Sequence, residues 1–330
     1  MSILILCLRE AKLQCTLIEG YCKAARYEPG DTDVPQTLWN AVYVEYGWQI
    51  VHPFWICRAL YGHRLGGWIK VEQDGMNVSH KEKESAGVVK STFHDRYFMP
   101  KPEEYLYECC AIDPPWQLVE TEKEVKNKAE FLKRPYLLPP FHGLGLKLIS
   151  EQRSELESKD GRCRIEFKGK RSNAHFLILT YELFQKDDTE TDDMNITKRS
   201  LPRMVFNSRA NEHFYFDIRF PVKGDFKLVI YGGPYQSSAL RICEFKIKCS
   251  QLMPECKLLP LDGSKIGWGP GPVAMEAGLL MPSKPNGLIS VNKSDKELRS
   301  EIKFRIRDDF INSREVGTDQ TNMYVLLTYS

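Results

Sequence analysis

Thiols and one imidazole near the start of the chain are the side chains best suited to covalent chemistry. Cys7, Cys15 and Cys22 precede His52, which lies in the run VHPFW. A cysteine attacks a substrate as its thiolate, so it needs an adjacent imidazole to accept its proton and a third group to orient that imidazole. The plainer interpretation, and the one we expect, is that all three cysteines are small buried side chains that pack as hydrophobes.

Three strands are expected to position these groups. Residues 37–42 read TLWNAV and residues 48–55 read WQIVHPFW, with β-forming side chains on either side of the turn signal YG. A further strand is expected over residues 14–21, beside the strand that begins with Thr37. Of the three thiols, Cys22 is then the least unsuitable nucleophile, because its strand neighbours Thr37.

These segments resemble the second half of a transglutaminase-like domain of the papain type. In that family the pattern is His-x-Trp-Asn-Ala-Val, followed by a strand that ends Val-Asp-Pro-x-Trp. The His is the general base there, and the Asp orients it. This chain has Thr37 at the His position and His52 at the Asp position. Trp39, Asn40 and Trp55 match the frame of the family's site.

The resemblance implies a site that has lost its chemistry. Thr37 cannot accept a proton near neutral pH, and His52 stands in the orienting position, one strand further from the nucleophile. The family's nucleophilic Cys begins a helix, and we expect this chain to start inside that helix, so that the Cys lies upstream of Met1. We therefore predict a pseudo-enzyme without catalytic residues, in which Thr37 and His52 mark a degenerate triad.

Length and composition describe a globular protein. The chain has 330 residues, of which 42% are hydrophobic and 27% charged, enough for two or three domains. Its formal net charge of +2 gives no overall attraction to nucleic acid. No apolar run approaches the roughly 18–20 residues that cross a bilayer, and the N-terminus lacks a signal-peptide pattern. We therefore expect a cytoplasmic protein without nucleic-acid or membrane partners.

The cysteines are expected to be reduced. There are ten of them, no secretion signal accompanies them, and none forms a CxxC pair of the zinc type. Cys109 and Cys110 are adjacent, which is poor geometry for an ordinary disulfide. The sequence therefore predicts no metal site, no cofactor and no structural disulfide.

The chain is expected to combine an α+β domain with β-rich modules. We predict a partial transglutaminase-like domain over 1–120, followed by a charged, helix-prone connector over 121–133. Within the first domain, the segment of about residues 58–90 contains several glycines and a polar run. This composition predicts a surface loop or insertion. Strict alternation of apolar and polar residues, as in 214–220, predicts an Ig-like β-sandwich over 134–253.

An internal repeat indicates a second module. The run LGLKL at 144–148 is echoed by AGLLM at 277–281, and FLILTY at 176–181 is echoed by YVLLTY at 324–329. Repeats at this spacing are typical of tandem modules. Because the chain stops just after the last echo, we expect a truncated second module and a chain that is a fragment. The expected division is a Gly/Pro linker over 254–276 and the truncated Ig-like module over 277–330.

Further motifs narrow the resemblance to the kyphoscoliosis peptidase and hillarin group. They are YFMPKPEE at 97–104, WQL at 116–118 and WGPG at 268–271. Proteins of this group are associated with cytoskeletal, muscle or cytokinesis machinery. The resemblance therefore implies a scaffold that binds other proteins, with cytoskeletal proteins as the expected partners. Two alternatives stay open: a cysteine peptidase or transglutaminase-like enzyme whose nucleophile lies upstream of this chain, and a purely structural fragment.

Overall fold

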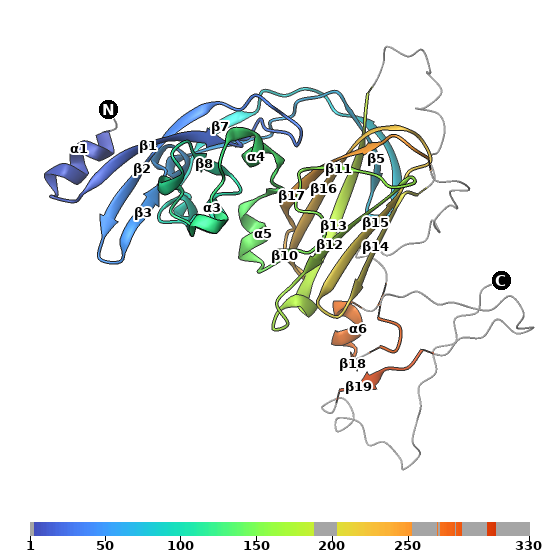
Figure 1. The fold of residues 1–330 in the computed structure, drawn as a ribbon. Coiled ribbons are helices and arrows are strands. Elements are labelled where there is room, and N and C mark those ends of the chain that lie inside the picture. Colours follow the sequence, from blue (N-terminus) through green and yellow to red (C-terminus); the bar gives the residue numbers. More distant parts are fainter. Residues whose placement is uncertain are drawn as a thin grey trace, which may run out of the picture.

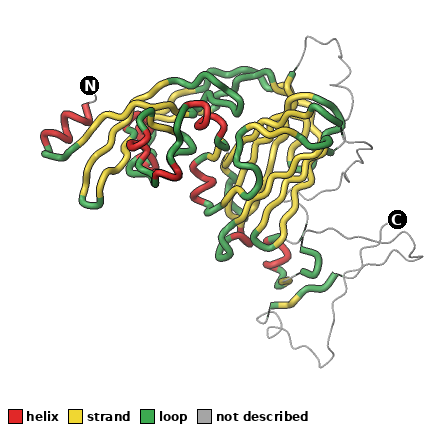
Figure 2. Tube along the Cα trace, in the orientation of Figure 1, coloured by secondary structure: helices red, strands yellow, loops and turns green. Residues whose placement is uncertain are grey.

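Strands dominate the part of the chain that the structure describes. The computed structural model describes residues 3–187, 203–252, 269, 271–280, 282–285 and 302–307 (Figure 1). Its α-helices contain only four to eight residues (Figure 2). The predicted α+β class is therefore supported only in part, since this largely β character does not by itself establish a transglutaminase-like domain. None of the described helices is long and apolar enough to cross a membrane.

A four-stranded antiparallel sheet carries the residues of the predicted site, in the order β3-β2-β1-β8. Its strands are β1 (Cys15–Cys22), β2 (Gln36–Val44), β3 (Gly47–Val51) and β8 (Cys109–Ala111). The predicted strands and their turn are confirmed, because Val44 of β2 pairs with Gly47 of β3. Gly20 of β1 pairs with Thr37 of β2, as the expected neighbourhood of these strands requires.

Short helices accompany this sheet. They are α1 (Ile3–Glu10), α2 (Pro53–Cys57), α3 (Pro102–Tyr105), α4 (Lys128–Lys133) and the three-ten helices η1 (Asp95–Tyr97), η2 (Pro114–Gln117) and η3 (Thr121–Lys123). Prolines open α2, α3 and η2, at a position where the missing N–H has no helical partner to lose. The connector predicted over 121–133 contains η3 and α4, and Phe131 of α4 is fully buried.

The indole of Trp39 forms the centre of the first sheet's core. Trp39 is 1% exposed and meets the ring of Tyr105 edge-on, with the centroids 5.7 Å apart. The indole lies directly over the backbone of Gly20, where an added Cβ would stand 2.1 Å from an indole carbon. Only glycine fits at this position of β1, because any side chain would displace the ring.

The segment predicted as a surface loop, about 58–90, is instead built of four strands. They are β4 (Arg58–Tyr61), β5 (Trp68–Gln73), β6 (Met76–Lys81) and β7 (Val88–Ser91). β4 and β7 form a two-stranded ribbon, whereas β5 pairs with β13 of the following module and β6 pairs with β5. These strands were not predicted because β6 is almost entirely exposed and polar, so it lacks the alternation of apolar and polar residues that indicates a strand.

Two sheets packed face to face form the predicted Ig-like sandwich. One sheet has the order β10-β12-β15-β14, and the other has the order β11-β17-β16-β13-β5-β6, with β9 also paired to β17. The strands, with α5 and η4 between them, are β9 (Tyr136–Leu137), α5 (Pro139–Gly143), β10 (Lys147–Leu148), β11 (Glu155–Glu157), β12 (Arg162–Lys168), η4 (Ala174–Phe176), β13 (Leu177–Lys186), β14 (Val205–Ala210), β15 (His213–Arg219), β16 (Gly224–Pro234) and β17 (Leu240–Cys249). Alternate side chains of β15, including Phe214 and Phe216, enter the core, as the alternation predicted.

Little of the predicted second module falls among the described residues. These are α6 (Pro272–Glu276), β18 (Leu279–Leu280) and β19 (Arg305–Ile306), with β18 and β19 antiparallel. The helix α6 lies in the segment predicted as a linker, 254–276, and most of that segment lies outside the described residues. The echo at 324–329 also lies outside them, so the truncated module stays a prediction.

Candidate functional site

His52 lies at the junction of β3 and α2 and is wholly buried. As the residue that caps α2, it accepts a hydrogen bond at Nδ1 from the backbone N–H of Trp55, at 3.3 Å. Its ring stacks on that of Trp55 with centroids 4.6 Å apart and lies nearly parallel to that of Trp39 at 6.2 Å. Burial lowers the pKa of His52 to about 4, so the imidazole is neutral near pH 7.

A disulfide joins Cys22 of β1 to Cys109 of β8, which corrects the prediction of no structural disulfide. The two residues are direct partners in the antiparallel ladder, with Cα atoms 4.1 Å apart, and each is 1% exposed. Sequence reasoning missed the pair because 87 positions separate the residues and only the fold brings β8 beside β1. Cys110 stays free because its side chain enters a different apolar cluster from that of Cys109.

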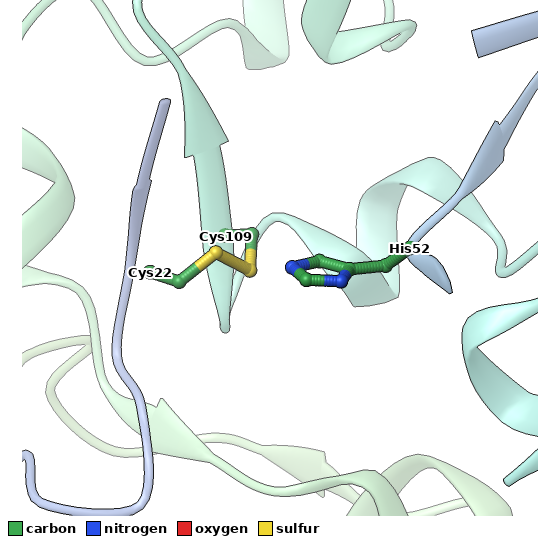
Figure 3. Close-up of side chains that lie close together, drawn as sticks. All are labelled: Cys22, His52 and Cys109. Carbon is green, nitrogen blue, oxygen red and sulfur yellow. A yellow bond between two sulfur atoms is a disulfide. The ribbon is translucent and has the colours of Figure 1, made fainter. Parts of the chain in front are cut away.

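The imidazole of His52 lies against this disulfide. Figure 3 shows the ring nitrogen farther from the backbone, Nε2, pointing toward the sulfurs. One ring nitrogen of His52 and the sulfurs of Cys22 and Cys109 lie within 4.8 Å of one another. The placement of His52 one strand further from the family's nucleophile stays a prediction; within the described residues its ring extends from the end of β3 to the sulfurs on β1 and β8. Nε2 has no hydrogen-bond partner among the described residues.

Thr37 occupies the same face of the sheet as this cluster. It lies two residues from Trp39 on β2 and directly opposite Gly20, which lies two residues from Cys22 on β1. Its hydroxyl donates and accepts hydrogen bonds but does not take up a proton near neutral pH. The only imidazole in the cluster is thus His52, and the sulfurs beside it are bonded to each other.

The frame predicted from Trp39, Asn40 and Trp55 is split between the two faces of β2. Trp39 and Trp55 pack around His52, whereas Asn40 follows the opposite alternation and is 0% exposed. Within the described residues, the Asn40 amide, Trp39 Nε1 and the Tyr105 hydroxyl lack hydrogen-bond partners. Unpaired buried atoms also occur elsewhere among the described residues, for example at His63 and His94, so those of Trp39 and Tyr105 do not by themselves mark a functional site.

The other early thiols do not join the site. Cys7 is exposed and Cys15 is half-buried, so the expectation that both are buried is wrong for Cys7. Cys15 Sγ contacts the carbonyl oxygen of Ile5 at 3.8 Å, which places it against α1.

A cavity among the described residues also lies elsewhere. It has a volume of about 370 Å³ and is lined by residues of β5, β13 and β16 together with Glu28. Its charges compensate one another: Lys227 Nζ lies 2.9 Å from Glu28, and Lys70 Nζ lies 2.5 Å from Glu182. These ion pairs indicate a structural network in this part of the cavity.

Comparison with known proteins agrees with the fold. Residues 128–260 match the family of KY-like, immunoglobulin-like domains. The chain is 28% identical over 314 residues to the Lim and transglutaminase domain protein ltd-1 of Caenorhabditis elegans, covering 90% of this chain and 39% of that protein. It is 25% identical over 340 residues to Hillarin of Drosophila melanogaster, covering 97% of this chain and 38% of that protein.

The chain therefore spans about two fifths of the length of these curated relatives. The matched domain encloses the sandwich predicted over 134–253, and both relatives are similar to the chain across the first sheet as well as the sandwich. These comparisons confirm the resemblance to the KY/hillarin-like family that the sequence motifs indicate.

Proposed function

We propose that this chain is a non-catalytic, transglutaminase-like protein that acts as a protein-interaction scaffold. The observation that carries the proposal is the chemistry of the two degenerate positions. Thr37 stands where the family has its base, and His52 stands where the family has the carboxylate that orients it. The one imidazole in the cluster is wholly buried beside a disulfide.

This arrangement lacks both halves of a cysteine–histidine pair. A nucleophilic sulfur must be a thiolate that a substrate can reach, but Cys22 and Cys109 are 1% exposed and bonded to each other. A neutral His52 cannot stabilise a thiolate as its imidazolium partner, because burial lowers its pKa to about 4. Loss of a triad member alone lowers turnover by roughly 10⁴-fold in comparable enzymes.

The sandwich supports the scaffold part of the proposal. One of its two sheets is extended by β5 and β6 from the first domain, so that the two parts share one hydrogen-bonded ladder. Ig-like sandwiches serve many unrelated functions, so the kind of partner comes from the family resemblance, which implies a cytoskeletal protein in the cytoplasm.

A turnover assay tests the absence of catalysis. The full chain, in oxidised form and after treatment with a thiol reductant, is incubated with a fluorescent primary amine and with an unfolded protein substrate between pH 6 and pH 9. We expect no thiol-dependent amine incorporation or cleavage above the protein-free control. Turnover that disappears in C22S or H52Q, but persists in C110S, would show that an enzyme is present and that the proposal is wrong.

Filament co-sedimentation tests the scaffold. The full chain is mixed with assembled actin filaments and, separately, with microtubules, and the pellets are assayed for bound chain. We expect saturable binding to one of the two filaments. A chain that stays in the supernatant with both, at concentrations up to about 100 μM, would contradict a direct cytoskeletal partner.

A further inference from the structure

Two sulfurs and an imidazole nitrogen meet in the first sheet from three separate elements. Cys22 ends β1, Cys109 begins β8, and His52 caps α2. Their ligand atoms lie within 4.8 Å of one another, and all three side chains are buried (Figure 3). The sheet holds both sulfur-bearing residues as paired neighbours, and packing between two indoles holds the imidazole.

We propose that the chain binds a thiophilic transition-metal ion, with Zn²⁺ as the preferred ion. The ligands are Cys22, His52 and Cys109, and the ion binds when the disulfide between the two cysteines is reduced. The disulfide and the metal site are alternative states of the same three residues. Two thiolates with one imidazole form a donor set that Zn²⁺ accepts, whereas Mg²⁺ and Ca²⁺ require oxygen ligands.

The unpartnered nitrogen supports a ligand role for His52. Nε2 is aimed at the sulfurs and has no hydrogen-bond partner among the described residues. A histidine that ligates through Nε2 must carry its proton on Nδ1 and donate it to an acceptor, commonly a backbone carbonyl. In the disulfide-bonded chain Nδ1 instead accepts from the Trp55 N–H at 3.3 Å, so ligation through Nε2 requires the other tautomer.

The backbone N–H of Trp55 does not oppose this tautomer. It lies 3.3 Å from His52 Nδ1 but also donates to the carbonyl oxygen of His52 at 3.1 Å. Loss of the longer contact would therefore leave the N–H with an acceptor. Three protein ligands would leave the fourth position of a tetrahedral Zn²⁺ to a water.

Atoms, electrons and protons balance in the exchange between the disulfide and the metal-bound state. Two molecules of a thiol reductant convert the disulfide into two cysteine thiols and are themselves joined as a disulfide. Zn²⁺ then binds both sulfurs and the imidazole, and two protons leave the thiols. In the reverse direction an oxidant such as diamide takes up two electrons and two protons, the sulfurs bond to each other, and Zn²⁺ is released.

Zinc stoichiometry of the full chain tests the proposal. The chain is reduced with a phosphine, desalted without oxygen, mixed with Zn²⁺ alone, desalted again and analysed for metal by mass spectrometry. We expect about one Zn²⁺ per reduced chain and less than about 0.1 per diamide-oxidised chain. C22S, C109S and H52Q should each weaken binding by more than about 100-fold, beyond the loss caused by removing an outer-shell partner.

C110S is the matched control, because Cys110 is the next residue on β8, is equally buried and enters a different cluster. It should keep full stoichiometry. Alkylation of the unmutated chain gives a reading that does not depend on folding of the variants: Zn²⁺ should protect Cys22 and Cys109 and leave the exposed Cys7 reactive. Absence of stoichiometric zinc from the reduced chain, equal loss in C110S, or protection of other cysteines would each overturn the proposal.

Discussion

Two regions of the molecule each bury an ionisable side chain completely, and they treat it in opposite ways. In the sandwich, Glu72 of β5 accepts hydrogen bonds from the Tyr181 hydroxyl at 2.5 Å and from the backbone N–H of Met204 at 2.6 Å. In the first sheet, His52 accepts one bond at Nδ1, while its Nε2 has no partner among the described residues. Both carboxylate oxygens of Glu72 have hydrogen-bond partners, whereas only one of the two ring nitrogens of His52 has one among the described residues.

The difference lies in how far the fold satisfies each buried polar group. Each oxygen of Glu72 binds β14 or β13, so this carboxylate fastens the β5–β6 hairpin into the sandwich. Around His52, the indole N–H of Trp39 and the hydroxyl of Tyr105 are also unpaired among the described residues. A buried polar group without a partner is costly, and the metal ion proposed above would give His52 Nε2 a partner.

The largest effect is expected from Trp39→Ala, which removes the centre of the first sheet's core. Deletion of a buried aromatic side chain costs about 3–5 kcal/mol of unfolding free energy. Chemical denaturation of the full chain, followed by a signal that reports on the first sheet, measures the loss. A cost below about 1 kcal/mol would mean that β1, β2 and β3 do not pack as described.

The pH dependence of stability is the next effect in size. His52 has a folded pKa of about 4, below its unfolded value of about 6.5, so the unfolded chain binds more protons as pH falls. Its contribution to stability is therefore present above pH 6.5 and lost progressively between pH 6.5 and 4, by about 3 kcal/mol. Burial raises the pKa of Glu72, which acts in the opposite direction, so the comparison requires a variant.

His52→Phe isolates this contribution, because it keeps an aromatic ring between the two indoles and removes the titration. Between pH 6.5 and 4, the variant should lose about 3 kcal/mol less stability than the unmutated chain. Equal slopes for the two proteins would show that His52 is hydrated or ionised in the folded state.

A pair of substitutions at fixed pH tests the contrast directly. Glu72→Gln should cost about 2–3 kcal/mol, since an amide cannot accept from both Tyr181 and Met204 as a carboxylate does. His52→Phe, measured at pH 7.5, should change stability by no more than about 1 kcal/mol, the worth of a helix cap. Denaturation midpoints of both variants give the comparison, and a larger cost for His52→Phe would reverse it.

The smallest effect is expected from Cys110→Ser in the metal-free chain. Cys110 makes contacts near 3.4 Å with Gln117, so replacing its sulfur by a hydroxyl should cost about 1 kcal/mol and leave the disulfide intact. Thiol titration and denaturation measure the two quantities. Loss of the Cys22–Cys109 disulfide in this variant would mean that the bonded partner was misassigned.

The parts of the fold that could be predicted from sequence are those set by neighbouring residues. The strands around Trp39 and Ile50 follow from β-forming side chains on either side of a turn, and β15 follows from strict alternation. The β5–β6 hairpin could not be recognised, because Glu72 reads as a surface charge until Tyr181 and Met204 are known to surround it. That network joins residues more than 100 positions apart.

Of the candidate site, only the match to the family's sequence pattern could be predicted. The motif around Thr37 and His52 identifies the two altered positions. The disulfide and its contact with His52 depend on the pairing of β1 with β8, which brings Cys109 from 87 positions away. Adjacent cysteines rarely form a disulfide with each other, and this rule was right to exclude a Cys109–Cys110 bond. It gave no information on a partner in another strand.

Site-resolved thiol reactivity tests the central claim, the absence of a catalytic cysteine, most directly. The reduced, metal-free full chain is alkylated with iodoacetamide between pH 5 and pH 9, and each cysteine is quantified by mass spectrometry. We predict that no thiol reacts faster than an ordinary cysteine, with rates that rise toward pH 8.5 or above. Cys243, Cys110 and Cys163 should be among the slowest, because burial raises the pKa of Cys243 well above its usual value and the pKa of the other two to about 12. Rapid alkylation of a single cysteine at pH 6, abolished by His52→Gln, would contradict the account.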